Sequence, residues 1–211
     1  MPSRTVVRGE PRGEKPQSLR ASLLALLVLL LVGGTLASGA MGALSSHLVV
    51  MPSGSMRNTL REGDFILVTG PPLGSRAACR DDLVLFRAPH MASRTGARFV
   101  KRVVGLPGDT VAVLKGELYV NGRRVPEPCI RQPMYYEFPP VPYSSTDERI
   151  WGKLTESGGM ACVRVPEETL FVLGDNRNDS NDSHCWGYVP IGNVIGKATY
   201  RFWPLNRMGK L

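Results

Sequence analysis

The feature that most constrains this chain is one long apolar segment near its N-terminus. Between Ala21 and Leu44 the sequence ASLLALLVLLLVGGTLASGAMGAL contains no charged residue. An α-helix of that length, rising about 1.5 Å per residue, crosses the roughly 30 Å hydrocarbon core of a bilayer. We therefore expect a transmembrane anchor over residues 21–44.

The charges before this segment predict its orientation. Basic side chains outnumber acidic ones in residues 1–20: Arg4, Arg8, Arg12, Lys15 and Arg20 against Glu10 and Glu14. Because basic flanks remain in the cytoplasm, we expect a cytoplasmic tail over residues 1–20 and an extracytoplasmic domain over residues 45–211. The alternative is a cleaved export signal, since the apolar core Leu23–Val32 is short and small residues follow it. We favour a retained anchor because the uncharged run continues past such a site; the mass of the mature protein distinguishes the two.

The exported part has the pattern of a β-rich domain. Its apolar runs are short and bounded by turn residues, and no helical periodicity persists over three turns. LYVNGRRV (118–125) contains Asn-Gly between extended segments, a strong hairpin signal. The segment 126–166, rich in Pro, Tyr, Ser and Gly, has the pattern of a loop or a small excursion from the main sheet. Further strands are expected in FILV (65–68), DLVLF (82–86), FVKRVVGL (99–106), LFVLGD (170–175) and KATYRFW (197–203).

Composition narrows the classes of partner and cofactor. The net charge of +8 favours an acidic partner, either nucleic acid or an anionic bilayer surface. No nucleic-acid-binding motif is present, so we expect no nucleic acid as a partner. The sequence has neither a C-x-x-C pair nor H-E-x-x-H, and we expect no metal and no cofactor. The pairing of the four cysteines stays open: Cys79, Cys129, Cys162 and Cys185.

A serine-rich turn, MPSGSM (51–56), follows the apolar segment closely. A serine becomes a nucleophile only when a base removes its proton. Of the three histidines, His47, His90 and His184, the last is the best candidate, but it lacks a recognisable partner arrangement. The patterns G-x-S-x-G and S-x-x-K are absent, which disfavours the α/β-hydrolase and penicillin-binding types of site.

A lysine can serve as the base if it is neutral. Its pKa of about 10.4 must then be lowered by burial among apolar groups. Lys101 is the candidate, because it lies in FVKRVVGLPGD, a β-branched run that ends at a sharp turn. An outward-facing, solvated lysine is the ordinary alternative for a strand.

Four motifs occur in order along the chain: MPSGSM, RDDLVLF, FVKRVVGLPGD and GDNRNDSNDS. Together they resemble the bacterial type I signal peptidases, membrane-bound proteases with a Ser/Lys dyad, over most of residues 49–203. The resemblance implies a mainly β, signal-peptidase-like catalytic domain tethered by one N-terminal transmembrane helix. It also implies a serine endopeptidase that removes signal peptides from exported preproteins after small residues, at Ala-x-Ala-like sites. Its partners would be signal peptides and the lipid bilayer.

The resemblance also implies roles for particular residues. Ser55 would be the nucleophile, Lys101 its general base, and the Ser53 hydroxyl an oxyanion donor. Ser180 would orient the lysine amine, while ion pairs among the remaining charged residues would stiffen the site: Asp175, Arg177, Asp182 and Arg102. The pockets for small side chains would be lined by Val49, Met51, Pro52, Met56, Leu60, Phe99 and Val100.

The sequence departs from the family pattern in places, which leaves alternatives open. Arg57-Asn58 replaces a common proline, Asp81-Asp82 a Gly-Asp pair and Asn178-Asp179 an Asp-Asn pair. The family's variable region must be short, within about 115–165. A specialised peptidase for a pilin or transfer-system substrate, or a non-catalytic, membrane-tethered β domain that binds peptides, therefore remains an alternative function. A self-cleaving repressor of related architecture is disfavoured by the apolar segment.

Overall fold

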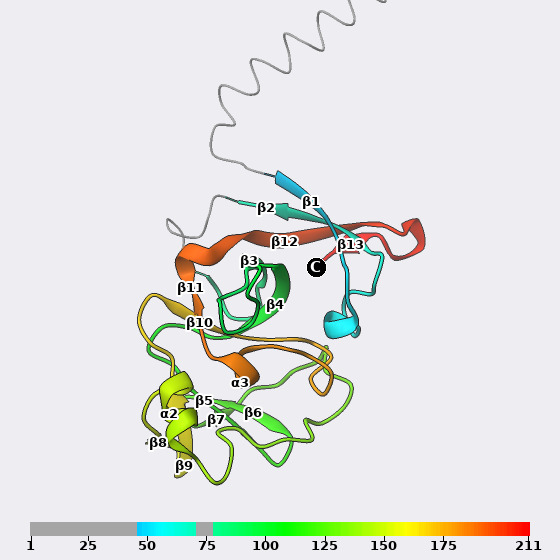
Figure 1. Cartoon of the computed structure of the whole chain (residues 1–211). Helices are drawn as coiled ribbons and strands as arrows, with labels where there is room; N and C mark the ends of the chain where they lie inside the picture. The colour runs from blue at the N-terminus through cyan, green and yellow to red at the C-terminus, as the bar shows by residue number, and fades with distance from the viewer. Residues whose placement is uncertain (1–45, 71–77) are drawn as a thin grey trace, which may run out of the picture. The chain divides into compact units, whose positions relative to one another are not determined.

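The computed structural model describes residues 46–70 and 78–211. This part of the chain is mainly β, as the apolar runs predict (Figure 1). No helix within these two ranges is long and apolar enough to cross a membrane. The predicted tail over 1–20 and anchor over 21–44 lie outside the described residues.

A large antiparallel sheet carries most of the predicted strands. Within the described residues it has eight strands in the order β1-β2-β12-β3-β4-β10-β11, and β13 pairs with β12. Its central strands are rich in Val, Leu and Phe, which suits a sheet that is covered on both faces. The strands are β1 (Ser46–Val50), β2 (Phe65–Thr69), β3 (Leu83–Arg87), β4 (Arg98–Gly105), β10 (Thr169–Leu173), β11 (Val189–Pro190), β12 (Val194–Trp203) and β13 (Gly209–Lys210).

A second sheet is built mostly from the region expected to be variable. In the described part of the chain it has five strands in the order β7-β6-β5-β9-β8. The predicted hairpin is present: Asn121 and Gly122 turn with φ of 51° and 72°, as a two-residue hairpin turn requires. The segment 126–166 was expected to be a loop or a small excursion from the main sheet; the structure agrees with the second reading, because β8 and β9 complete this separate sheet. The strands are β5 (Thr110–Leu114), β6 (Glu117–Val120), β7 (Arg123–Arg124), β8 (Thr155–Ser157) and β9 (Met160–Arg164).

The helices are short and their ends are capped locally. In α2 (Ser145–Trp151), Ser144 and Asp147 form a capping box that satisfies the first amide groups. In α3 (Ser183–Trp186), the Asp182 carboxylate accepts the His184 N–H. The 3₁₀ turns are η1 (Gly54–Met56), η3 (Ile191–Asn193) and η4 (Leu205–Arg207).

Strand β4 is held at the junction of the two sheets. A Cβ on Gly105 would lie 2.9 Å from atoms of Phe171, Val111 and Val165, so only glycine fits there without displacement. Phe171 belongs to β10 of the large sheet, whereas Val111 belongs to β5 of the second. This close packing fixes the end of β4, the strand that also carries Lys101.

Candidate active site

Ser55 lies on η1, the tight turn that follows β1. The turn is tied to the loop after β10: the Asn176 N–H donates to the Ser55 carbonyl at 3.0 Å, and Asn176 Nδ2 donates to the Gly54 carbonyl at 3.1 Å. The Met56 side chain is fully buried, and its sulfur accepts the Asp175 N–H at 3.4 Å. These contacts fix the backbone of the turn and leave the Ser55 side chain half-buried at the surface.

Ser53 places a second hydroxyl beside that of Ser55. The two Oγ atoms are 3.3 Å apart, within hydrogen-bonding distance. Ser53 is exposed and occupies the N-cap position with φ of −146° and ψ of 162°, but its side chain makes no capping hydrogen bond. A hydroxyl in this position can also reach an oxyanion that forms next to Ser55.

Lys101 is buried on β4. Only 3% of the residue is exposed, and its Nζ donates to Ser180 Oγ at 2.9 Å. Burial lowers the pKa of Lys101, because the charged ammonium loses its hydration; the negative charges of Asp182, Asp175 and Cys185 oppose this effect without cancelling it. A lysine in this environment becomes neutral at a lower pH than an ordinary lysine.

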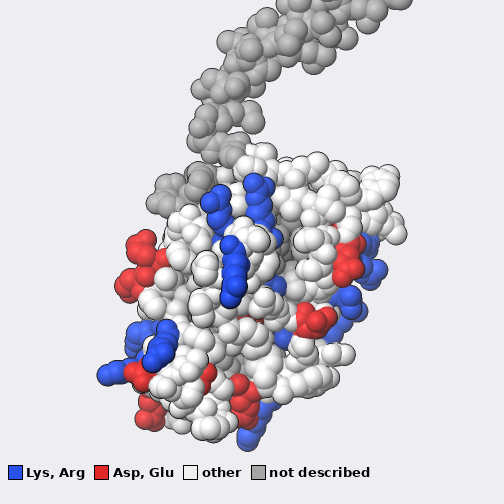
Figure 2. Space-filling view, viewed as in Figure 1, with Lys and Arg blue, Asp and Glu red and all other residues white. Residues whose placement is uncertain are grey.

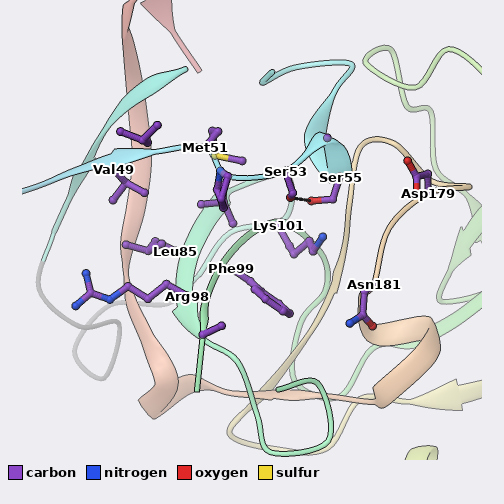
Figure 3. Close-up of a pocket in the computed structure, with 15 residues that line it drawn as sticks. Val49, Met51, Ser53, Ser55, Leu85, Arg98, Phe99, Lys101, Asp179 and Asn181 are labelled. Carbon is purple, nitrogen blue, oxygen red and sulfur yellow. Dashed lines mark hydrogen bonds between the residues drawn. The ribbon is translucent and has the colours of Figure 1, made fainter. Parts of the chain in front are cut away.

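Ser55 and Lys101 line the same cleft, of about 530 Å³. In Figure 3 the Lys101 side chain extends from its strand toward the segment that carries Ser53 and Ser55. Among the hydrogen bonds of the described residues, none joins the Lys101 amine to the Ser55 hydroxyl directly. Such bonds often form only when substrate is bound.

The cleft contains most, but not all, of the predicted pocket residues. Val49, Met51, Pro52, Phe99 and Val100 line it, together with Leu85, Arg98, Asp179 and Asn181, which the sequence did not indicate. The prediction for Met56 and Leu60 was wrong. Both are fully buried in the core and are not among the residues that line the cleft, because η1 turns Met56 inward and Leu60 follows in the same cluster.

Arg102 and Asp175 form a buried ion pair beneath the site. Arg102 donates from Nε and Nη2 to the two carboxylate oxygens of Asp175, at 2.7 and 2.6 Å. Asp175 is fully buried, and further contacts tie it to the segment that follows Ser55: Thr59 donates to its carboxylate and Asn58 Nδ2 donates to its carbonyl at 2.7 Å. Asn58, one of the departures from the family pattern, therefore belongs to the supporting network.

The other charged residues of the predicted network also form ion pairs, with partners that the sequence did not indicate. Arg177 makes a two-pronged pair with Glu127, including an Nη1–Oε2 contact of 2.7 Å. Asp182 accepts the Gly174 N–H at 2.9 Å and pairs with His184. Sequence reasoning missed Glu127, because nothing in its local sequence distinguishes it from a solvated loop residue.

Gly174 joins the two halves of the site. A Cβ at this position would lie 2.1 Å from Ser180 Oγ and 2.5 Å from the Ser55 carbonyl oxygen. Any side chain would therefore push apart the serine that contacts Lys101 and the turn that carries Ser55. Glycine is required at the first position of the motif GDNRNDSNDS because both segments pack directly against its backbone.

A serine on a hydrogen-bonded turn and a buried lysine held by another serine line one cleft of a mainly β domain, an arrangement that suits a serine peptidase. The family model described as "Signal peptidase, peptidase S26" matches residues 19–203. The chain belongs to this signal peptidase family, and it is a serine endopeptidase.

Named relatives match over most of the chain. The signal peptidase I of Leptolyngbya laminosa is 37% identical over 165 residues, which cover 76% of this chain and 70% of that protein. The signal peptidase I of Bacillus caldolyticus is 35% identical over 158 residues, covering 75% and 80%. A solved signal peptidase I from Enterococcus faecalis is 31% identical and covers 59% of this chain and 98% of its own, with a TM-score of 0.39.

Proposed function

We propose that this signal peptidase removes signal peptides with Ser55 as nucleophile and Lys101 as general base. The observation that carries the assignment is the Lys101 amine, which is buried, lowered in pKa and hydrogen-bonded to Ser180 in the cleft that Ser55 lines. No other lysine of the described residues lines that cleft. The role of Ser180 is to hold the amine in one orientation.

Acylation proceeds by two proton transfers through one amine. Neutral Lys101 takes the Ser55 proton as Oγ bonds to the scissile carbonyl carbon, and the resulting ammonium then protonates the departing amine of the mature protein. Water, deprotonated in turn by Lys101, hydrolyses the acyl-enzyme and releases the signal peptide. The Ser53 hydroxyl stabilises the oxyanion; one such donor contributes about 3 kcal/mol in the transition state.

The substrate binds as an extended strand along the cleft. In this arrangement alternate side chains enter pockets and the backbone supplies hydrogen bonds. The cleft lining is mainly apolar, and Met51, Phe99 and Leu85 are among its larger apolar side chains. We expect small residues before the scissile bond, as at Ala-x-Ala sites.

We also propose a single-pass membrane protein with its N-terminus in the cytoplasm and residues 45–211 on the extracytoplasmic side. Support comes from the uncharged segment 21–44 and the basic residues before it. The net charge of +8 favours an anionic bilayer surface, and Figure 2 shows lysine and arginine side chains gathered over the β3–β4 region.

The test is cleavage of a preprotein that has an Ala-x-Ala site, with the full chain in detergent or liposomes. Ser55→Ala should lower the rate by about 10⁴-fold or more. Ser93→Ala is the matched control, because Ser93 is half-buried in a loop and its hydroxyl bonds locally, to the Thr95 hydroxyl and the Ala97 N–H. Cleavage that persists in Ser55→Ala would refute the assignment.

Substrate that stays intact with the wild type would favour a peptide-binding domain, and strongly unequal rates across unrelated preproteins would indicate a specialised enzyme.

A further inference from the structure

Beside the cleft, three side chains from one short stretch form a hydrogen-bonded series that the proposed mechanism does not use. His184 Nδ1 lies 2.7 Å from Asp182 Oδ1, and His184 Nε2 lies 3.2 Å from Cys185 Sγ. The order is therefore carboxylate, imidazole, thiol. This is the arrangement in which an oriented histidine activates a sulfur nucleophile.

The imidazole of this series is fixed on three sides. Asp182 is fully buried and is itself held by the Gly174 N–H at 2.9 Å. The ring of His184 stacks on that of Tyr136, with centroids 4.2 Å apart and planes inclined by 9°. His184 is consequently held with Nδ1 toward the carboxylate and Nε2 toward the sulfur.

The charge of His184 suits activation of the thiol. Burial alone lowers the pKa of His184, but the hydrogen bonds to Asp182 and Cys185 outweigh it and raise the pKa to about 9. The imidazole is then protonated at neutral pH and donates from Nε2 to Cys185 Sγ. A neighbouring imidazolium favours the thiolate, which is the nucleophilic form of cysteine.

The other cysteines lack this arrangement. All four are free thiols and all lie within the described residues; only Cys79 and Cys185 are exposed, while Cys129 is half-buried and Cys162 is buried. The thiol of Cys79 has no histidine partner among the hydrogen bonds of the described residues. Cys79 is therefore a matched control: its thiol is exposed like that of Cys185 but has no histidine beside it in the described part of the chain.

We propose that Cys185 is a covalent modification site that takes small disulfides reaching the extracytoplasmic face. The thiolate attacks one sulfur of R–S–S–R; a bond forms between Cys185 Sγ and RS, the disulfide bond of the reagent breaks, and RS⁻ leaves with the electron pair. The modified protein is a mixed disulfide, and a thiol reverses the reaction.

Modification of Cys185 should also change the pKa of Lys101, a consequence that rests on the proposed function. Four acidic groups raise the pKa of Lys101 through their negative charge, in opposition to burial: Asp182, Asp175, Cys185 and Asp179. A neutral cap on Cys185 removes one of these charges, so the Lys101 ammonium is less stabilised and its pKa falls. Peptidase activity should then begin to rise at a lower pH.

The first experiment measures reactivity without reference to peptidase activity. The full chain is treated with methyl methanethiosulfonate at pH 6.5, and modification of each cysteine is followed by peptide mass spectrometry. Cys185 should react about tenfold faster than Cys79, and its rate should change less with pH between 6 and 8. His184→Gln should reduce the Cys185 rate to that of Cys79, while Cys79→Ser should leave it unchanged.

Equal rates at Cys185 and Cys79, with the same pH dependence, would overturn the proposal. So would a Cys185 rate that His184→Gln leaves unchanged. The pH dependence in the unmutated chain decides the matter even if the His184 variant does not fold. Because labelling is measured by mass, an inactive peptidase would refute the proposed function without affecting this result.

The second experiment compares two labels of different charge. The methylthio cap is neutral, whereas sulfonatoethyl methanethiosulfonate leaves a negative charge at the same position. We expect the neutral cap to shift the rise of activity to lower pH by about a few tenths of a unit, and the negative cap to leave it near the unmodified position. Identical profiles for both labels would overturn the link to Lys101.

Discussion

Two lysines flank the same residue of the large sheet and have opposite environments. Lys101 of β4 and Lys197 of β12 are both in register with Val84 of β3. Lys101 is 3% exposed, and its amine bonds to the neutral hydroxyl of Ser180. The Lys197 side chain is 47% exposed and forms an ion pair with Asp82.

The difference shows that position, and not residue type, decides what a strand lysine can do. Lys197 is exposed enough to keep much of its hydration, and solvent screens its pair with Asp82. Around Lys101 the carboxylates act from a distance and the loss of hydration dominates, so the pKa is lowered. The large sheet thus contains a structural cation, Lys197, and a proposed base, Lys101, on the two strands that flank β3.

The largest expected effect comes from replacing each lysine by methionine. Lys101→Met should lower the rate of preprotein cleavage by about 10³-fold or more, because no neighbouring amine can take the Ser55 proton. Lys197→Met should stay within about twofold of the wild type. A chromogenic or gel-based cleavage assay on both variants measures the contrast.

Stability separates chemistry from misfolding in this comparison. Because burial disfavours the ammonium, Lys101 costs the folded state free energy at every pH below the lysine pKa of the unfolded chain. Lys101→Met should therefore unfold at the same or a higher temperature at pH 7. A marked decrease in its melting temperature would mean that the loss of activity reflects unfolding.

A second contrast tests Gly174, whose backbone lies against Ser180, the residue that accepts the Lys101 hydrogen bond. Gly174→Ala introduces a Cβ 2.1 Å from Ser180 Oγ and should lower activity by about 10²-fold, because the base and nucleophile segments are forced apart. Gly192→Ala lies just before the strand of Lys197, where a Cβ meets nothing within 4 Å. This control should retain full activity; equal losses in both variants would contradict the close approach at Gly174.

The third prediction concerns pH. If Lys101 must be neutral, activity should decrease about tenfold per pH unit on the acid side of its pKa and reach a plateau above it. Because that pKa is lowered, the rise should be complete at a lower pH than for an ordinary lysine. The profile is measured as kcat/KM against pH.

His184 is the rival base for this profile, since its pKa is raised to about 9. His184→Gln should keep the rise of activity with pH, with at most a small displacement. A profile that becomes flat in this variant would assign the titration to His184 and not to Lys101.

The smallest expected effect is the contribution of the Lys197–Asp82 pair to stability. Lys197→Met should change the free energy of unfolding by less than about 1 kcal/mol, because one partner is well exposed and screened. Arg102→Met is the matched comparison: it leaves Asp175 buried and unpaired and should cost about 3–5 kcal/mol. Denaturant unfolding of both variants measures the difference.

The predicted strands were found where a short apolar run is continuous and bounded by turn residues. FILV, DLVLF and FVKRVVGL became β2, β3 and β4 within one or two residues, because burial on both faces leaves a continuous apolar pattern. β8 and β9 were missed, since Thr155–Ser157 and Met160–Arg164 are short and partly polar, and their pairing arises from contact with β5.

Three of the predicted site residues come from three different motifs: Ser55, Lys101 and Ser180. The order of these motifs along the chain made the resemblance recognisable without coordinates. Glu127 could not be found, because its partner Arg177 lies 50 residues away and only the folded loops bring them together. Asp182, His184 and Cys185 lie close together in the sequence, but the hydrogen bonds between their side chains could not be predicted from it.

The two hydrogen bonds that Asn176 donates to the turn of Ser55 have a consequence for biosynthesis. Ser55, the proposed nucleophile, leaves the ribosome early, whereas Asn176, whose main-chain and side-chain amides bond to its turn, follows 121 positions later. A nascent chain that stops short of Asn176 contains Ser55 and Lys101 but lacks these two hydrogen bonds and the Ser180 partner of Lys101. We therefore expect the peptidase to become active only after this part of the chain has been synthesised.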